Sequence, residues 1–325
     1  MRVAVVGLGS MGNRRIRLIG KYDEVIQIIG VDNNEERRKK VENEYGIKCY
    51  AALGHVIDAI HIDCVFVCTS PLSHSGIITQ ALNHSIHVFS ELNLVTDGYE
   101  ENIALAKKNK LILFLSSTFL YRNEIIKIKA LAKEADCMLN YTYHIGQYLP
   151  DWHPWENYRN YFVGDTRTNG CREIFAIELP WLTEVFGNIV KIDVVKSKMS
   201  NLDINYNDNY LVIMEHSSGC KGVLAVDVVS RKAVRNLEVF GEQLYLHWDG
   251  SPTGLFLYDF AAKQDVNIKL YEDIDQLGNY NSFIVENAYL NEIASFFQAV
   301  NEGETPIYGF EKDGVILEII DRIEA

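Results

Sequence analysis

The sequence predicts an α/β protein that begins with a doubly wound parallel sheet. Short, continuously apolar runs alternate with helical stretches through the first third of the 325 residues. An apolar run of this kind suits a strand that is buried on both faces. The alternation of strand and helix is typical of βαβ units, and a glycine-rich turn after the first run supports the same fold.

The predicted elements follow one another in a regular order. The strands are expected at "VAVVG" (3–7), "VIQIIGVD" (25–32), "CVFVCTS" (64–70), "HVFSE" (87–91) and "LILFLSS" (111–117). The helices between them are expected at 13–21, in the charged stretch "NEERRKKVENEYG", at 73–83 and at 97–108. Gly46 ends the charged stretch, and glycine is the usual residue just after a helix because it adopts the left-handed conformation there.

The first turn carries the motif "GLGSMG", which runs from Gly7 to Gly12. Gly7 permits a tight turn, Gly9 lets the backbone approach a pyrophosphate, and Gly12 permits close packing of helix on sheet. The following helix offers free N–H groups and the positive end of its dipole to phosphates. Ser10 and Met11 complete the turn, so 7–12 is predicted to bind a dinucleotide.

Asp32 stands at the end of the second predicted strand, twenty residues after Gly12, and Asn33 follows it. A carboxylate here accepts hydrogen bonds from both ribose hydroxyls and repels a 2′-phosphate. The sequence therefore favours NAD over NADP, with Asn33 as a neighbouring contact. The basic residues at 37–39 are either a solvated helix face or a source of one cation for a 2′-phosphate.

The composition excludes several other classes of protein. A net charge of −13 and a pI near 5.2 argue against a nucleic-acid partner or an anionic membrane surface. No apolar run is long enough to span a bilayer, and the opening residues do not resemble a signal peptide. The six cysteines show no CxxC pair and no zinc-like spacing, so we expect no metal and a cytoplasmic protein with reduced thiols.

Three segments carry a resemblance to a known family. They are "VAVVGLGSMGNRR" (3–15), "VFVCTSPLSHSGIITQALNHSIHVFSE" (65–91) and "YLNEIASFFQAVNEGETPIYGFEKDGVILEII" (289–320). Together they resemble the glucose-fructose oxidoreductase / inositol dehydrogenase / MocA family across nearly the whole chain.

The resemblance implies an NAD-binding Rossmann domain, 1–118, followed by an α/β domain, 119–325, whose C-terminal helix can pack back on the first. The second domain would carry a large, mostly antiparallel sheet, the substrate site and the interface of a homo-dimer or homo-tetramer. Family members oxidise or reduce a carbon of a sugar, cyclitol or nucleotide-sugar with NAD(P).

The resemblance also implies a set of cofactor contacts after the third and fourth predicted strands. Thr69, Ser70, Pro71 and His74 would lie along the cofactor, although His74 suits a purely structural hydrogen bond equally well. Glu91 matches the acidic residue of the family's Glu-Lys-Pro motif and would also lie at the cofactor.

The chain departs from the family at both proton-transfer positions. The motif lysine is replaced by Leu92, and Asn93 follows it as a residue able to hydrogen-bond a substrate hydroxyl. The family's Asp-x-Gly-x-His segment reads "NGCREIFAIELPWLTEVFG" here, with Ile174 near the aspartate and Glu178 near the histidine.

Hydride transfer from an alcohol still needs a group that takes the hydroxyl proton. Glu178 is one candidate, because a carboxylate in an apolar helix is either paired, shifted in pKa or lining a cavity. His153 is the other. It lies in the aromatic segment "HIGQYLPDWHPWENYRNYF" (144–162), where aromatic faces and polar groups together suit a sugar site or an interface.

Substrate contacts are expected from the same segment and from the end of the first domain. The candidates, besides Asn93, are Arg122, Trp152, Trp155, Tyr158 and Arg159. Arg122 could equally pair with a nearby acid for stability.

Three functions remain open from the sequence. The first is an NAD-dependent oxidoreductase on a sugar-like substrate with a non-standard proton-transfer set. The second is an inactive, NAD-binding sensor or scaffold, and the third is a lyase that uses NAD transiently.

Overall fold

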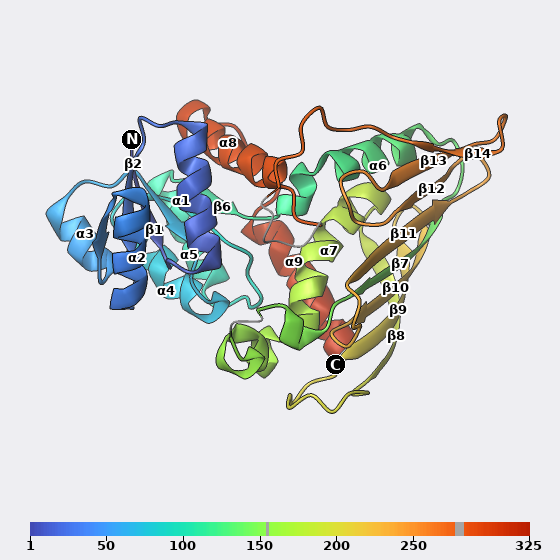
Figure 1. Ribbon diagram of the computed structural model, residues 1–325, viewed down its shortest axis with the longest axis horizontal. Coiled ribbons are helices and arrows are strands. Elements are labelled where there is room, and N and C mark those ends of the chain that lie inside the picture. Colours follow the sequence, from blue (N-terminus) through green and yellow to red (C-terminus); the bar gives the residue numbers. More distant parts are fainter. Residues whose placement is uncertain (154–155, 277–282) are drawn as a thin grey trace. The chain divides into compact units, whose positions relative to one another are not determined.

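The computed structural model describes residues 1–153, 156–276 and 283–325, and the chain divides into two compact units (Figure 1). Unit 1 comprises Met1–Ser117 and Tyr289–Leu317. Unit 2 comprises Thr118–Ala288 and Glu318–Ala325. Each unit has its own sheet, and the first boundary lies one residue before the predicted one.

Unit 1 contains a six-stranded parallel sheet in the order β3-β2-β1-β4-β5-β6, which is the doubly wound order of dinucleotide-binding folds. This confirms the predicted fold class. The strands are β1 Arg2–Val6, β2 Gln27–Val31, β3 Lys48–Tyr50, β4 Cys64–Val67, β5 His87–Ser90 and β6 Leu113–Leu115.

The helices of unit 1 connect these strands and add two segments from the far end of the chain. They are α1 Ser10–Tyr22, α2 Glu35–Tyr45, α3 Leu53–Ala59, the 3₁₀ turn Pro71–Ser73, α4 His74–Asn83, α5 Tyr99–Asn109, α8 Glu286–Glu302 and the first half of α9 Phe310–Glu324. Gly46 ends α2 in the left-handed conformation, with φ of 66°. The strand β3 and helix α3 were not predicted, because each is short and only partly apolar.

Phenylalanine rings explain why residues from 289 onward belong to unit 1. Phe66, Phe89 and Phe114 are register partners on β4, β5 and β6, and their rings stack with centroids 4.5 and 5.0 Å apart. Phe296 on α8 meets all three rings edge-on, and Phe297 packs against Phe66 and Phe296. Helix α8 therefore completes the core of the parallel sheet. The predicted division assigned this segment to the second domain and allowed the C-terminal helix to pack back on the first.

A buried arginine holds the same elements together. Arg15 on α1 is fully buried and makes ion pairs with Glu91 at 2.5 Å and with Glu292 on α8 at 2.7 Å. Glu292 also accepts hydrogen bonds from the Ser116 hydroxyl and the Ser117 N–H. Burial alone would lower the pKa of Arg15, but the two carboxylates outweigh it and raise that pKa. Arg15 is therefore charged, and it neutralises part of the acidic cluster around it.

Unit 2 contains an eight-stranded sheet in the order β14-β13-β12-β11-β7-β10-β9-β8, antiparallel except between β7 and β10. This confirms the large, mostly antiparallel second sheet. The strands are β7 Asn140–Gly146, β8 Ile189–Ser197, β9 Asn209–His216, β10 Lys221–Asp227, β11 Val234–Phe240, β12 Tyr245–Trp248, β13 Leu255–Asp259 and β14 Gln264–Asn267.

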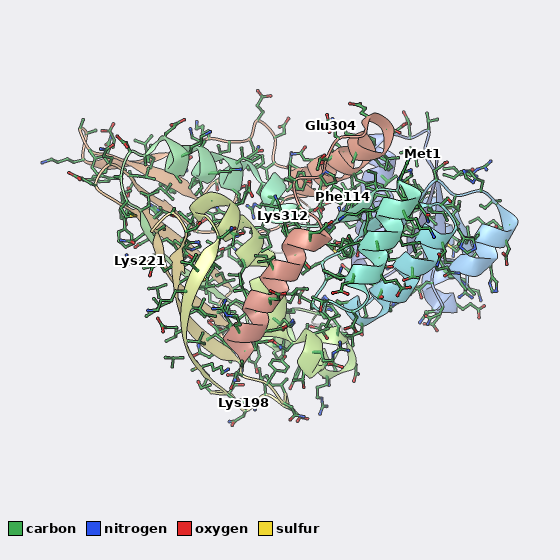
Figure 2. The ribbon with its side chains drawn as sticks, turned by 180° about the vertical axis from the view of Figure 1, so that it is seen from behind. Met1, Phe114, Lys198, Lys221, Glu304 and Lys312 are labelled. Carbon is green, nitrogen blue, oxygen red and sulfur yellow. The ribbon has the colours of Figure 1, made fainter. Side chains whose placement is uncertain are left out.

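Two long helices cover one face of this sheet, as Figure 1 shows. They are α6 Asn123–Glu134 and α7 Gly170–Phe186, and the 3₁₀ turns of unit 2 are Thr118–Tyr121, Leu149–Asp151, Tyr158–Asn160, Phe162–Gly164 and Thr166–Thr168. Along β9 and β10, buried residues alternate with more accessible ones, as expected when one face of a sheet is packed and the other is not. Figure 2 shows the side chains from the opposite side, with Lys221 at the start of β10 and Lys198 just after β8. None of the helices in the described ranges combines the length and apolar character that crossing a bilayer requires.

We predict that Arg15→Leu lowers the free energy of unfolding by about 3–5 kcal/mol, because it leaves Glu91 and Glu292 buried without their cation. Lys39→Ala is the control, since Lys39 forms an exposed pair with Glu35 that should contribute almost nothing. Urea unfolding followed by tryptophan fluorescence measures both. Equal stability of the two variants would show that the buried ion pairs do not hold unit 1 together.

Candidate functional site

The glycine turn between β1 and α1 has the geometry of a phosphate cradle. Gly7 has φ of 93°, a conformation that side chains disfavour. A Cβ on Gly12 would lie 1.8 Å from the carbonyl oxygen of Gly7, so a side chain there is excluded. A Cβ on Gly9 would meet no protein atom within 4 Å. The backbone at Gly9 is therefore open to a ligand, whereas Gly7 and Gly12 are required by the turn itself.

Asp32 is oriented by the backbone around it. One carboxylate oxygen accepts a hydrogen bond from the N–H of Leu8, and the other accepts from the N–H of Asn34, both at 2.8 Å. Each carboxylate oxygen has a second lone pair, so both can still accept from ribose hydroxyls. Asp32 thus links the glycine turn to the end of β2, where the adenosine ribose of a dinucleotide would be recognised.

The arginines after Asp32 are largely engaged with that strand end. Arg38 donates hydrogen bonds to the carbonyl oxygens of Asp32 and Asn33 at 2.7 and 3.0 Å. Arg37 is half exposed and its guanidinium lies 3.8 Å from the Asp32 carboxylate. Both arginines lie beside Asp32, whose negative charge would repel the 2′-phosphate of NADP. This arrangement supports NAD over NADP.

The loop after β4 is held in shape by its own hydroxyl groups. Ser73 donates its hydroxyl proton to the carbonyl oxygen of Ser70 at 2.7 Å, and its Oγ lies 2.8 Å from the hydroxyl oxygen of Thr69. Pro71 begins the 3₁₀ turn, where its missing N–H costs nothing. These residues therefore form a rigid corner at the carboxyl end of the sheet, the end where ligands bind in open α/β folds.

His74 is buried against that corner. Its Nε2 lies 2.9 Å from the carbonyl oxygen of Thr69, and its Nδ1 lies 2.6 Å from the side-chain oxygen Oδ1 of Asn93. Burial lowers the pKa of His74, so the ring is neutral and has a single N–H. A single N–H can serve only one of these two acceptors, the carbonyl oxygen of Thr69 or Oδ1 of Asn93. Both ring nitrogens of His74 nevertheless have contacts within unit 1, and these contacts support the structural interpretation of His74.

Glu91 and Leu92 occupy the positions of the family's acidic residue and lysine. The Glu91 carboxylate is bound by Arg15, so its charge is used inside unit 1. Leu92 is partly buried and has no titratable group. The end of β5 therefore keeps a fixed backbone but supplies no base at position 92.

In unit 2, the side chain of Glu178 is fully buried, and its carboxylate makes three close contacts. It forms an ion pair with Arg235 at 2.5 Å and accepts hydrogen bonds from the Tyr143 hydroxyl at 2.9 Å and from Trp181 Nε1 at 2.6 Å. Of the alternatives open from the sequence, the buried ion pair is the one observed. The catalytic role of Glu178 stays a prediction, which these contacts do not favour.

Arg122 is also a buried, fully engaged side chain. It pairs with Glu124 at 2.7 Å and donates to the carbonyl oxygens of Phe283 and Gly250 at 2.8 and 3.1 Å. Its guanidinium also lies 4.9 Å from the ring of Trp248. The pairing with a nearby acid is therefore present, and a substrate contact by Arg122 stays a prediction.

The segment after β7 is fixed at several points. Trp152 donates from Nε1 to the carbonyl oxygen of Gln147, and its ring edge lies over Gly170 at the start of α7. Tyr158 accepts a hydrogen bond from the N–H of Asp203, and Arg159 pairs with the carboxylate of Asp203 on the surface. These contacts hold the segment against unit 2 and leave the predicted substrate roles untested. Trp155 lies outside the described residues.

His153 stacks on the ring of Tyr161, with centroids 4.5 Å apart and planes 28° from parallel. Burial lowers the pKa of His153, although Glu156, whose carboxylate is 3.9 Å from Nδ1, opposes the shift. A neutral imidazole near neutral pH can accept a proton, so the geometry is compatible with the predicted catalytic role.

A carboxylate that the sequence did not single out lies in the first turn of α7. Atom Oε2 of Glu173 is buried and has no hydrogen-bond partner among the described residues, and the same holds for the Tyr161 hydroxyl. Burial raises the pKa of Glu173 to about 7. In the sequence, an acidic residue in a first helical turn simply complements the helix dipole, so only the burial sets Glu173 apart.

These features define the class of the protein. Residues 1–117 match the family described as the oxidoreductase family with an NAD-binding Rossmann fold, Gfo/Idh/MocA. The resemblance, the oxidoreductase class and NAD as the cofactor are therefore confirmed.

A particular relative is similar over nearly the full length. Myo-inositol 2-dehydrogenase of Thermotoga maritima is 25% identical over 322 residues, which cover 94% of this chain and 90% of that protein.

Two solved structures share the fold at lower identity. A UDP-N-acetylglucosamine 3-dehydrogenase of Acidithiobacillus ferrooxidans has a TM-score of 0.74 at 18% identity and covers 100% of this chain and 96% of that one. A levoglucosan dehydrogenase in complex with NADH and L-sorbose has a TM-score of 0.82 at 13% identity and covers 99% of this chain and 95% of that one. Both likenesses bear on the fold alone.

We predict that Gly9→Ala weakens NADH binding by about tenfold or more, or about 1.4 kcal/mol, without loss of stability. The new methyl group meets no protein atom, but it occupies the space through which a pyrophosphate would approach the backbone. Gly20→Ala on the same helix is the control, because its Cβ is also unobstructed and it lies outside the turn. NADH titration and thermal melting of both variants provide the measurement. If Gly9→Ala binds NADH as tightly as Gly20→Ala, the cradle is not the phosphate site.

Proposed function

We propose that the chain is an NAD-dependent oxidoreductase that interconverts a hydroxyl and a carbonyl group on a sugar, cyclitol or nucleotide-sugar. The observation that carries the proposal is the intact dinucleotide cradle, in which Gly9 is open and Asp32 is aimed by two backbone N–H groups. The relative from Thermotoga maritima, named for a cyclitol, supports the substrate class.

The cofactor would be held by the glycine turn, by Asp32 with Asn33, and by the corner of residues 69–74. When bound there, NAD supplies hydride transfer, and the protein supplies position and the proton. Unit 1 offers no titratable side chain at position 92 for that proton. The rigid pairing of His74 with Asn93 instead fixes the corner and leaves little freedom for either side chain to act as a base.

Proton transfer is therefore proposed to occur in unit 2, beside His153 and the start of α7. The segment from Trp152 to Tyr161 carries aromatic faces for the C–H surfaces of a sugar and polar groups for its hydroxyls. Glu178 fits this role less well, because an ion pair and two hydrogen bonds already occupy its carboxylate.

We predict that the wild type binds NADH more tightly than NADPH and oxidises at least one of myo-inositol, D-glucose, D-gluconate and UDP-glucose with NAD.

His153→Asn should keep NADH affinity and lose turnover by about a hundredfold or more if the imidazole moves the proton. Glu178→Gln should chiefly lower thermal stability, since it leaves Arg235 buried without its partner. Absorbance at the nicotinamide band, NADH titration and melting curves separate these effects.

Tighter binding of NADPH would contradict the cofactor preference. Full activity of His153→Asn would remove His153 from proton transfer while leaving the enzyme assignment in place. A wild type that binds NADH and turns over no compound would favour the sensor or scaffold instead.

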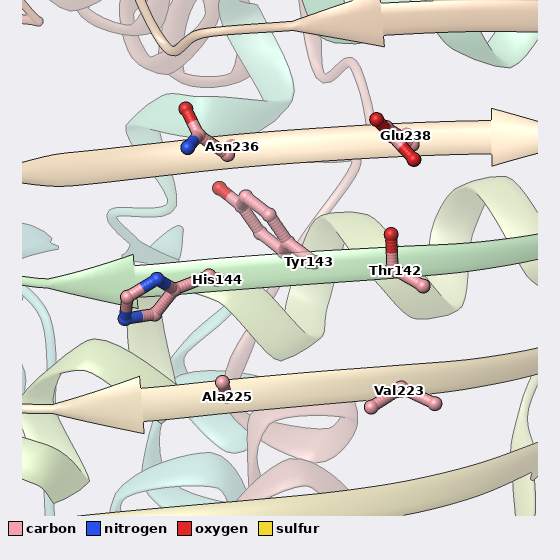
Figure 3. A pocket seen from close by; sticks show the side chains of 7 residues that line it. All are labelled: Thr142, Tyr143, His144, Val223, Ala225, Asn236 and Glu238. Carbon is pink, nitrogen blue, oxygen red and sulfur yellow. The ribbon is translucent and has the colours of Figure 1, made fainter.

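We also propose that unit 2 forms a homo-oligomer through the uncovered face of its sheet. Val195, Leu211, Ile213 and Val223 are exposed by 70, 48, 56 and 44%, and the register places them side by side on β8, β9 and β10. Val223 also lines a pocket formed by residues of β7, β10 and β11 (Figure 3). An apolar patch of this kind usually marks a protein interface.

The six free cysteines accord with a reducing, cytoplasmic location.

We predict that the wild type has at least the mass of a dimer and that Ile213→Glu dissociates it to monomers, because the new charge lies at the centre of the apolar patch. Val25→Glu is the control, since Val25 is 83% exposed and belongs to unit 1. Light scattering at micromolar concentration measures both. A monomeric wild type would exclude this interface.

A further inference from the structure

The start of α7 holds two buried polar atoms with no hydrogen-bond partner in the described residues, Oε2 of Glu173 and the hydroxyl of Tyr161. Leaving such groups unsatisfied costs about 1–3 kcal/mol each, more for a charged group, so a fold keeps them only for a reason. The two side chains are electrostatic neighbours. Burial is the largest cause that raises the pKa of Tyr161, and the nearby carboxylate of Glu173 is the next largest.

The surroundings of this pair are well defined. The ring of Tyr161 stacks on His153, and Trp152 packs at Gly170, one turn before Glu173. Arg172 is next to Glu173 but pairs with Glu324 and with Asp321, so it does not neutralise the Glu173 carboxylate. The other titratable groups that act on Tyr161 are Glu156 and Tyr206.

A hydroxyl group of a ligand has the chemistry to satisfy both atoms at once. It donates its proton to a carboxylate oxygen and accepts a hydrogen bond from a phenol. An apolar ligand satisfies neither atom, and an anionic one would be repelled by Glu173. The chemistry of the pair therefore suits a hydroxyl group on a neutral carbon, which is the reacting group of a sugar or cyclitol.

We propose that Glu173, in place of His153, is the general base of the reaction and that Tyr161 positions the reacting hydroxyl against it. The proposal rests on the proposed function. In the oxidation, the Glu173 carboxylate would take the O–H proton as the carbonyl double bond forms, and bound NAD would supply the acceptor for the carbon-bound hydrogen as hydride. The resulting glutamic acid then releases its proton to water, and the reduction runs through the same groups in reverse.

The protonation behaviour of Glu173 agrees with this role. Its pKa is raised from 4.5 to about 7 by burial, which is close to the value that suits a base at neutral pH. The folded state holds this proton more tightly than the unfolded state does, so protonation of Glu173 stabilises the fold. This stabilisation is fully present below about pH 4.5. That contribution is lost as the pH rises to about 7.

The test compares Glu173→Gln with Glu184→Gln, which makes the same change on the same helix at an exposed pair with Lys129. Glu173→Gln should keep NADH affinity and lose turnover, with the compound that the wild type oxidises, by about a hundred- to ten-thousandfold. It should also melt at a higher temperature than the wild type, and this gain should grow from about pH 4.5 to about pH 7. Tyr161→Phe should reduce turnover without loss of stability, and Glu184→Gln should match the wild type throughout.

A structural role for Glu173 predicts the opposite, namely a lower melting temperature at every pH with little change in turnover per folded molecule. A lower melting temperature with unchanged turnover would overturn the assignment of Glu173 as the base. Full activity of Glu173→Gln, measured beside an active wild type, would do the same. Neither result would affect the proposed function. A wild type that oxidises no compound would overturn the proposed function, and the assignment with it.

Discussion

The ion pairs of Arg15 are the interaction on which the rest of unit 1 depends. One guanidinium joins the helix that starts at the glycine turn, the end of β5 at Glu91 and the returning helix α8 at Glu292. Because Glu91 is fixed in this way, the residues after it have a defined position. Asn93 can then hold His74, and His74 can hold the corner at Thr69. The cofactor loops are thus preorganised from inside the domain.

Two glutamates on α7 have the same side chain in two different environments. Glu178 is surrounded by donors and by Arg235, so its negative charge is stabilised and its conformation is fixed. Glu173 lies five residues earlier, just over one helical turn, in a place that buries its Oε2 without giving it a partner. The first arrangement favours stability, whereas the second holds a carboxyl group ready to exchange a proton.

The first sheet and the cofactor loops could be predicted because their signals are local. Gly7, Gly9, Gly12 and Asp32 follow from the backbone geometry that a pyrophosphate and a ribose require, and each lies within one βαβ unit of the sequence. The difference between Glu173 and Glu178 could not be predicted, because it depends on Tyr143, Trp181 and Arg235, which come from three separate elements. Likewise, no local pattern indicates that Arg15 contacts residue 292, or that 289–317 completes the first domain.

The family match ends at residue 117, but the folded unit does not. A growing chain that has just left the ribosome at that point carries the whole parallel sheet, with Phe66, Phe89 and Phe114 still without Phe296 and with Arg15 still without Glu292. Completion must wait until nearly the entire chain has been synthesised. Contacts so distant in sequence slow folding and expose apolar surface in the meantime. Synthesis of this protein therefore includes a long interval in which its nucleotide-binding half is made but not finished, and in which chaperones have the most surface to bind.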